Sequence, residues 1–296
     1  MSPPGRETTA GRAYLDLRAR ARREGRPTDE LIVLYVLERF LFRLGRSDHR
    51  DRLVLKGGML LAVFEERRPT GDVDLLARST ANEVDTIAAI VREVASVEVD
   101  DGVRYEPDQL RSERIRETDA YAGVRLTMPA RLDRARHPLR IDVSVGDPVT
   151  PRPVEVEFPS LLEGPFRIIG YPLETVLAEK IVTMIERGDT TTRERDFADV
   201  YVLTRSREVV GTELAAALRA TADHRGVELR SLRSVLELLG TARQSDWTRF
   251  VRRSGLDTAV PTTYQAAIDA IADFADPLLT GEVSAAVWHP LSGRWA

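Results

Sequence analysis

The stretch from Leu53 to Ala77, LVLKGGMLLAVFEERRPTGDVDLLA, places a lysine, a pair of glycines and an Asp-Val-Asp sequence within one short segment. Its first residues are apolar and predict a short strand, and the apolar run after the Gly-Gly bend predicts a helix. A second strand is predicted at DVDLLA, where acidic and apolar residues alternate. A chain with this segment is therefore expected to form a strand, bend, helix and strand with charged side chains beside the bend.

Asp72 and Asp74 are expected to share one face of the second strand, because side chains two residues apart in a strand point the same way. Two neighbouring carboxylates repel each other unless a cation lies between them, and Mg²⁺ prefers oxygen ligands of this kind. An isolated Asp-x-Asp pair is as easily two acids on the protein surface. The residues around the pair must therefore decide between the two interpretations.

Gly57 and Gly58 are predicted to end the first strand and begin the helix. Free backbone N–H groups and the positive end of the helix dipole would then point into the bend, and glycine lets a phosphate approach the main chain. An ordinary tight turn is the alternative interpretation.

A further candidate ligand lies in PLRIDVSV, which alternates like a strand. Asp142 points to the polar side of this pattern, whereas Ile141 and Val143 point to the apolar side. An exposed face of an antiparallel sheet would explain the same pattern. If Asp142 instead joins Asp72 and Asp74 beside a phosphate-binding bend, the set describes a two-metal site for phosphoryl or nucleotidyl transfer.

The cationic residues are strongly biased, because only two of the 43 lysines and arginines are lysines, Lys56 and Lys180. A compact ammonium suits a site that a planar guanidinium would not fit, although two lysines can also survive a compositional bias. Lys180 lies in a helical apolar stripe with Val176 and Met184. A cation on an inward face needs an anion, and that anion is either a ligand triphosphate or a buried partner such as Asp196. Snorkelling of the side chain to solvent is a further alternative.

Composition narrows the class of protein. The chain has no cysteine, which excludes disulfides, thiolate metal sites and cysteine nucleophiles. Its N-terminal segment lacks the apolar core of a signal peptide, and its most apolar run, LIVLYVLERFLF, is interrupted by charges and too short to span a bilayer. We therefore expect a cytoplasmic protein with no membrane association.

The net charge of −4 argues against a uniformly basic surface, but arginines cluster locally. Such clusters are usually solvated faces, and they gain interest where phosphate binding is expected. One cluster lies near the N-terminus and another near the predicted Asp142 strand: Arg18, Arg20, Arg22, Arg23 and Arg26, then Arg131, Arg134, Arg136 and Arg140.

The periodicity predicts an α+β fold in three segments. Residues 1–47 are predicted to form N-terminal helices, residues 48–165 a lobe with a mixed sheet, and residues 166–296 a helical C-terminal lobe. The glycines and prolines of EGPFRIIGYP mark the second boundary.

The pattern Gly57-Gly58, a thirteen-residue gap and Asp72-Val73-Asp74-Leu75 resembles the glycine and Asp-x-Asp signature of the polymerase-β-like nucleotidyltransferases. Lys56 departs from it, because that signature has a hydrophobic residue before the glycines. LKGGMLL followed by RRPTGDVDLL is, however, similar to the AbiEii/MenT nucleotidyltransferase toxins, whose first motif carries Lys-Gly-Gly and an Arg-x-Thr/Ser before the aspartates.

Two later segments also resemble motifs of that family. ETVLAEKIVTM, with Lys180, matches its helical Glu-Lys motif, and RERDFADVY, with Arg193, Asp196 and Asp199, matches its Arg-x-x-Asp-x-x-Asp motif. The resemblance spans roughly residues 53–202 in the same order.

The resemblance implies a role for each matched residue. Asp72, Asp74 and Asp142 would bind two Mg²⁺ ions, with Asp142 on the ion that lowers the pKa of an attacking 3′-hydroxyl. Lys56, Gly57, Gly58 and Lys180 would hold the triphosphate of the substrate NTP. Asp196 would matter for activity through Lys180 or the nucleotide. Thr70 would contact the γ-phosphate, and its hydroxyl is also where an inactivating phosphate could be placed, although a hydroxyl that closes a turn is as good an explanation.

The resemblance further implies transfer of NMP to the 3′ end of tRNA, which would block aminoacylation and translation, and a cognate antitoxin protein as partner. We expect a monomer. The alternatives are a nucleotidyltransferase acting on small molecules, such as antibiotics, or on proteins, and a catalytically idle binding module.

Overall fold

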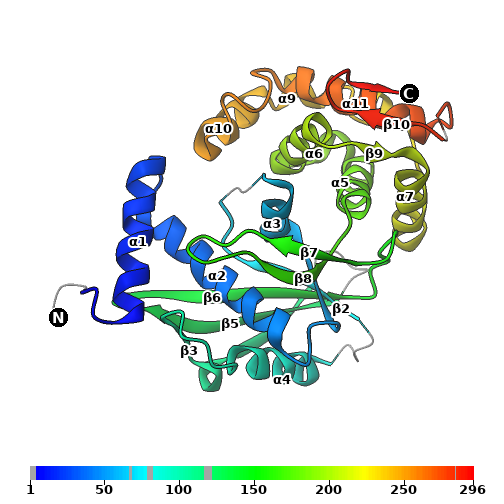
Figure 1. Cartoon of the computed structure of the whole chain (residues 1–296). Helices are drawn as coiled ribbons and strands as arrows, with labels where there is room; N and C mark the ends of the chain where they lie inside the picture. Colours follow the sequence, from blue (N-terminus) through cyan, green and yellow to red (C-terminus); the bar gives the residue numbers. More distant parts are fainter. Residues whose placement is uncertain (1–4, 67–68, 79–82, 117–121, 284) are drawn as a thin grey trace. The chain divides into compact units, whose positions relative to one another are not determined.

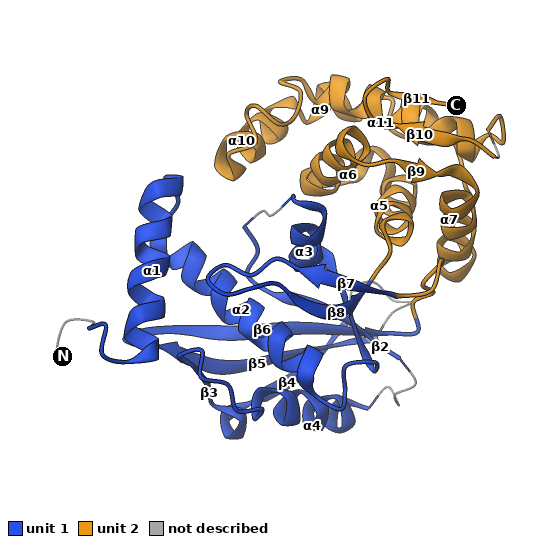
Figure 2. Ribbon diagram, in the orientation of Figure 1, with its two compact units in different colours: residues 1–146, 154–170 blue, residues 147–153, 171–296 orange. Residues whose placement is uncertain are grey.

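The structure is a computed structural model that describes residues 5–66, 69–78, 83–116, 122–283 and 285–296 (Figure 1). The chain forms two compact units, residues 1–146 with 154–170 and residues 147–153 with 171–296 (Figure 2). The N-terminal helices, which the sequence predicts as a separate segment, belong to the first unit. The second boundary falls after Gly170, a few residues beyond the predicted one.

The first unit is built on a mixed eight-stranded sheet with the order β3-β5-β6-β2-β1-β8-β7, and β4 pairs with β5. Strands β1 and β8 are parallel, as are β2 and β6, and the other pairs are antiparallel. The strands are β1 (Leu53–Lys56), β2 (Val73–Ala77), β3 (Val103–Tyr105), β4 (Arg111–Arg116), β5 (Ala122–Leu132), β6 (Ala135–Val145), β7 (Val154–Phe158) and β8 (Phe166–Gly170).

One face of this sheet forms the core. In β6 the side chains of Leu139, Ile141 and Val143 are buried, whereas the alternating Arg140 is exposed. The core face packs against α2 (Thr28–Arg46) and α4 (Val84–Ala95), and α1 (Thr9–Glu24) packs against α2 and β5. The apolar half of each strand is therefore covered, and the polar half faces away from α2 and α4.

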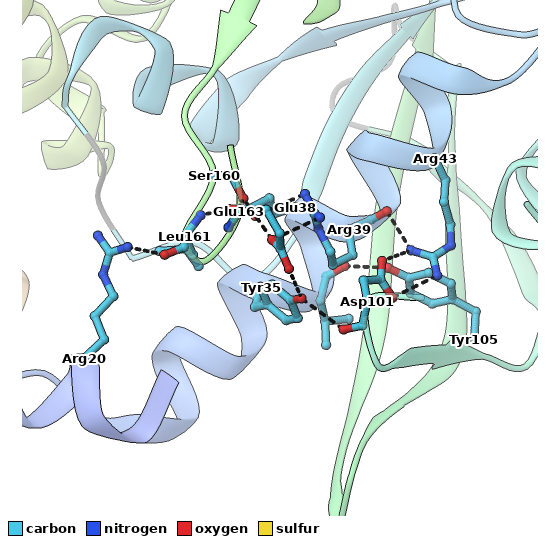
Figure 3. A network of polar contacts seen from close by, with 11 residues as sticks. Arg20, Tyr35, Glu38, Arg39, Arg43, Asp101, Tyr105, Ser160, Leu161 and Glu163 are labelled. Carbon is cyan, nitrogen blue, oxygen red and sulfur yellow. Dashed lines mark hydrogen bonds and ion pairs between the residues drawn. The ribbon is translucent and has the colours of Figure 1, made fainter. Parts of the chain in front are cut away.

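Helix α2 carries charged side chains into this core, and they form a polar network (Figure 3). Arg43 donates to Asp101 at 2.6 Å, with both side chains almost fully buried. Glu38 accepts hydrogen bonds from the Ser160 hydroxyl and the Leu161 N–H. Removing one partner of such a buried pair typically costs about 3–5 kcal/mol, so this network ties α2 to the sheet unit.

The second unit is mainly helical, with α5 (Leu173–Arg187), α6 (Glu194–Ser206), α7 (Gly211–Arg225), α8 (Leu232–Val235), α9 (Leu239–Ala242), α10 (Gln244–Ser254) and α11 (Tyr264–Leu279). A small sheet of β9 (Val209–Val210), β10 (Val287–His289) and β11 (Arg294–Trp295), which the sequence did not predict, joins the helices. The ring of Phe274 contacts Trp288 and Trp295, which fastens the end of the chain to α11. The predicted α+β class with a mixed sheet and a helical C-terminal lobe is confirmed.

Among the helices that the structure describes, none is long and apolar enough to cross a membrane.

Candidate active site

A row of charged residues crosses the polar face of the first unit's sheet. Lys56 of β1 pairs in register with Asp74 of β2, Asp74 with Asp142 of β6, and Asp142 with Arg125 of β5. Directly paired residues of neighbouring strands lie on the same face of a sheet. We call these residues, Lys56, Asp74, Asp142 and Arg125, the acid row. Asp142 and Asp74, which are far apart in the sequence, are thus direct neighbours.

Asp74 lies against the Gly-Gly bend. Gly57 has a φ of 66°, and a Cβ built on it would lie 1.9 Å from the Asp74 Oδ2. The next residue, Gly58, donates its backbone N–H to the Asp74 carboxylate. Only glycine combines this left-handed conformation with so close an approach of the carboxylate. The bend is therefore shaped around Asp74 and is more than a tight turn.

The pKa of Asp74 is raised to about 6: burial is the largest cause, the charges of Asp72 and Asp142 act in the same direction, and Lys56 and the Gly58 N–H oppose them. The balance shows that Lys56 alone does not neutralise the crowded carboxylates. Such a site favours an additional cation.

The carboxylate of Asp142 is held by Arg125, which the sequence analysis did not identify. Arg125 Nε donates to Oδ1 at 2.9 Å and Nη2 donates to Oδ2 at 2.7 Å. This bidentate pair raises the pKa of Arg125, chiefly through the hydrogen bond. Arg125 stands on the polar side of the alternating segment GVRLTM, which is the only signal that could have pointed to it.

Asp72 lies just before β2 and is linked to Thr70. The Thr70 hydroxyl donates to Asp72 Oδ1 at 3.0 Å. This contact matches the alternative in which the hydroxyl closes a turn. Arg68, which precedes it in the motif, lies outside the described residues.

The residues of the acid row provide ligands that suit Mg²⁺. Asp74 and Asp142 are neighbouring carboxylates with oxygen donors, and Asp72 is close enough to shift the pKa of Asp74. A small, partly open cavity of about 30 Å³ is lined by Lys56, Asp74, Asp142 and Ser144 among others. Within the described parts of the chain no group of three or more His, Asp or Glu side chains is already arranged to hold a metal. Asp142 would have to exchange Arg125 for the ion.

Lys180 and Asp196 lie in the second unit and form a cluster of their own. The Lys180 ammonium donates to Asp196 Oδ1 and to Asp199 Oδ2, both at 2.7 Å. Arg193 donates to the other Asp196 oxygen at 2.7 Å. The buried-partner alternative for Lys180 is therefore present in the structure, with Asp199 as a second partner.

Asp196 is only 4% exposed. Burial by itself would raise the pKa of Asp196, but the charges of Lys180 and Arg193 and the hydrogen bond from Lys180 outweigh it and hold the pKa well below its usual range. Asp196 thus stays ionised and fixes the position of the ammonium group.

The chain was compared with curated proteins, solved structures and protein-family models. No curated protein sequence matches the chain. Among solved structures, a candidate nucleotidyltransferase from H. pylori has a TM-score of 0.48 at 15% identity, covering 86% of this chain and 96% of that chain. JHP933 from Helicobacter pylori has a TM-score of 0.46 at 14% identity, covering 83% of this chain and 91% of that chain.

The protein-family model described as "Nucleotidyl transferase AbiEii toxin, Type IV TA system" matches residues 39–273. The match includes the Gly-Gly bend, the acid row and the Lys180 cluster. Because it extends over most of the sequence, the chain belongs to the AbiEii family of nucleotidyltransferase toxins.

Proposed function

We propose that this toxin is a Mg²⁺-dependent nucleotidyltransferase that transfers NMP from an NTP to the 3′ end of tRNA. The observation that carries the proposal is the register of Lys56, Asp74 and Asp142 on three neighbouring strands, beside a bend that only glycine can form. This arrangement offers carboxylates for divalent ions next to backbone N–H groups and an ammonium for phosphates.

In the reaction, the 3′-oxygen of the RNA forms a bond to the α-phosphorus as the bond to the β-phosphate oxygen breaks, and pyrophosphate and a proton leave. Asp72, Asp74 and Asp142 would hold two Mg²⁺ ions. When bound, the ions activate the hydroxyl and neutralise the developing charge. Lys56, Gly57 and Gly58 would hold the triphosphate, with the Gly58 N–H keeping Asp74 in place, and this positioning would supply a large part of the rate enhancement.

Lys180 is proposed as a second phosphate ligand of the NTP, and Asp196 as the residue that positions it. Their hydrogen bond restricts where the ammonium group can point. Asp196 would then affect activity without contacting the reacting atoms. Thr70 is proposed to contact the γ-phosphate from the same turn that holds Asp72.

The biological consequence would be a tRNA that cannot be aminoacylated, and so an arrest of translation in the cytoplasm. We propose a monomeric toxin with a cognate antitoxin protein, since the family is that of a toxin–antitoxin system.

The direct test incubates the protein with total RNA, Mg²⁺ and each of the four α-labelled NTPs in turn. Label is expected in the tRNA band, at its 3′ end, with wild type and with Asp51→Ala, a control that removes an exposed acid outside the acid row. Asp74→Ala is expected to abolish incorporation. Label in protein or in a small molecule but not in RNA would reject the tRNA substrate, and full activity of Asp74→Ala would reject the metal assignment.

A further inference from the structure

The polar face of the sheet continues beyond the acid row as a band of arginines. Two strand positions from Asp142, the register aligns β6, β5 and β4 as Arg140, Thr127 and Arg111. Four positions further along β6, Arg136 pairs with Arg131 of β5, and Arg131 pairs with Arg104 of β3. Figure 1 shows β5 beside β6, and the register places β3 and β4 next to β5. We call this surface the arginine face: Arg104, Arg111, Arg131, Arg136 and Arg140.

The arginine face is exposed, because its side chains form the outward half of the strand alternation. All of its members are exposed, whereas the alternating Leu126, Met128 and Leu139 are buried on the core face. Arg131 pairs with Glu106 at 2.6 Å. In the described part of the chain the other members form no ion pair. Several like charges are therefore held together on a rigid sheet without an internal counter-charge for most of them.

A groove of about 710 Å³ runs over this face. Its lining includes Arg111, Arg131 and Arg136, the acidic residues Glu106 and Asp108, and Leu110, and no Phe, Tyr or Trp is among the described residues that line it. Aromatic side chains would be expected for stacking of bases and as anchors of a protein interface. The three arginines outnumber the two acids of the lining, one of which, Glu106, is paired with Arg131, so the groove is suited to phosphate groups.

We propose that the arginine face binds the sugar–phosphate backbone of the RNA whose 3′ end enters the acid row. This inference rests on the proposed function. The distance supports it, because the stretch of β6 from Asp142 to Arg136 spans about 20 Å along the strand. Several phosphates of one strand fit within that length. The contacts would position the RNA and would carry no base specificity.

The arginines of the other arginine-rich segments differ from those of the arginine face in their contacts. Arg20 of α1 is bound to Glu24 and to the Leu161 carbonyl oxygen, and Arg26, which follows α1, is bound to Glu30. Arg134, in the turn after β5, packs on the Tyr14 ring and donates to its hydroxyl. These side chains are already engaged within the first unit. Arg22 and Arg23 of α1 are exposed, but Arg136 and Arg140 lie on the strand that carries Asp142.

The test compares two double variants that remove the same charge. Arg136→Gln/Arg140→Gln alters the arginine face, and Arg22→Gln/Arg23→Gln alters exposed arginines of α1. Binding of a 5′-fluorescent RNA hairpin with a short single-stranded 3′ end is followed by anisotropy at several salt concentrations, with melting temperatures as the check on folding. The arginine-face variant is expected to bind on the order of tenfold more weakly, with a salt slope lower by about 1.5. The α1 variant is expected to bind like wild type.

Equal losses in both variants, or no loss in either, would overturn the proposal. The proposal would also be overturned if the arginine-face variant bound RNA normally but no longer bound a co-expressed antitoxin protein. The arginine face would then be a docking site for an acidic protein. Transfer of NMP is measured separately on the same variants. If transfer to RNA occurs and is insensitive to Arg136→Gln/Arg140→Gln, the arginine face fails and the proposed function stands. If the arginine face binds RNA but none of the four NTPs labels the RNA, the proposed function is wrong and the arginine face remains an RNA-binding surface.

Discussion

The guanidinium of Arg125 holds both carboxylate oxygens of Asp142, at 2.9 Å from Nε and 2.7 Å from Nη2. The same carboxylate is the one proposed to bind a metal ion. Arg125 and Mg²⁺ should therefore compete for Asp142.

Arg125→Gln is expected to strengthen Mg²⁺ binding. The Arg125 side chain is 43% exposed, so the pair is worth no more than about 1 kcal/mol, and the Mg²⁺ dissociation constant should fall about two- to fivefold. The rise in melting temperature on titration with Mg²⁺ measures this without relying on activity. Arg114→Gln, which changes an exposed arginine of β4 outside the acid row, is the control. An unchanged or weaker Mg²⁺ response would show that the two cations do not compete.

Asp74→Asn is expected to stabilise the metal-free protein at high pH. The pKa of Asp74 is about 6 in the folded protein, whereas its ordinary value, which applies to the unfolded chain, is 3.8, so folding favours the protonated form. The benefit of that form is fully present below pH 3.8 and is lost as the pH rises through about 6. At pH 8 the variant should gain up to about 3 kcal/mol in the free energy of unfolding.

Urea unfolding in EDTA from pH 4 to pH 8 measures this gain. Asp51→Asn, at an exposed acid, should show no such pH-dependent difference from wild type. A variant that is equally or less stable than wild type at pH 8 would contradict the electrostatic description of the acid row. Added Mg²⁺ should narrow the difference, because it stabilises only the wild-type site.

Gly57→Ala should impair both folding and activity. The added methyl group would meet Asp74 at 1.9 Å, and the φ of 66° is strained for alanine. We expect a loss of about 1–3 kcal/mol in the free energy of unfolding, and little or no NMP transfer. Gly71→Ala is the matched control, because a Cβ there meets nothing within 4 Å. A fully active Gly57→Ala protein would show that the bend does not need to fit Asp74.

Lys180→Met should destabilise the second unit. A lysine whose only role is to bind phosphate could be replaced by methionine at little cost, but here the ammonium lies between two carboxylates that are 4% and 7% exposed. Leaving them without it should cost about 3 kcal/mol or more. Urea unfolding of Lys180→Met and of Lys180→Met/Asp199→Asn measures this. The double variant should recover part of the loss, and equal stability of wild type and Lys180→Met would contradict the pairing.

The local pattern of the sequence was sufficient to predict the elements that carry the site. The Gly57-Gly58 bend, the strand at Asp72–Asp74 and the alternating strand at Asp142 each depend on residues that are close in the chain. Alternation also predicted that Asp142 lies on the polar face of its strand, whereas Asp72, which was predicted to share a strand with Asp74, lies just before β2.

The tertiary structure decided which charges meet. Whether Asp142 lies beside Asp74, and whether Arg125 or a core residue lies beside Asp142, depends on the register between strands from distant parts of the chain. Shifting one strand by a single residue would keep its alternation and change every one of these neighbours. The partners of Lys180 could not be predicted from the sequence for the same reason. A helical stripe predicts that a side chain points inward but not which anion it meets. What this sequence determined alone is the set of charged groups and the faces they occupy; packing determined their pairing.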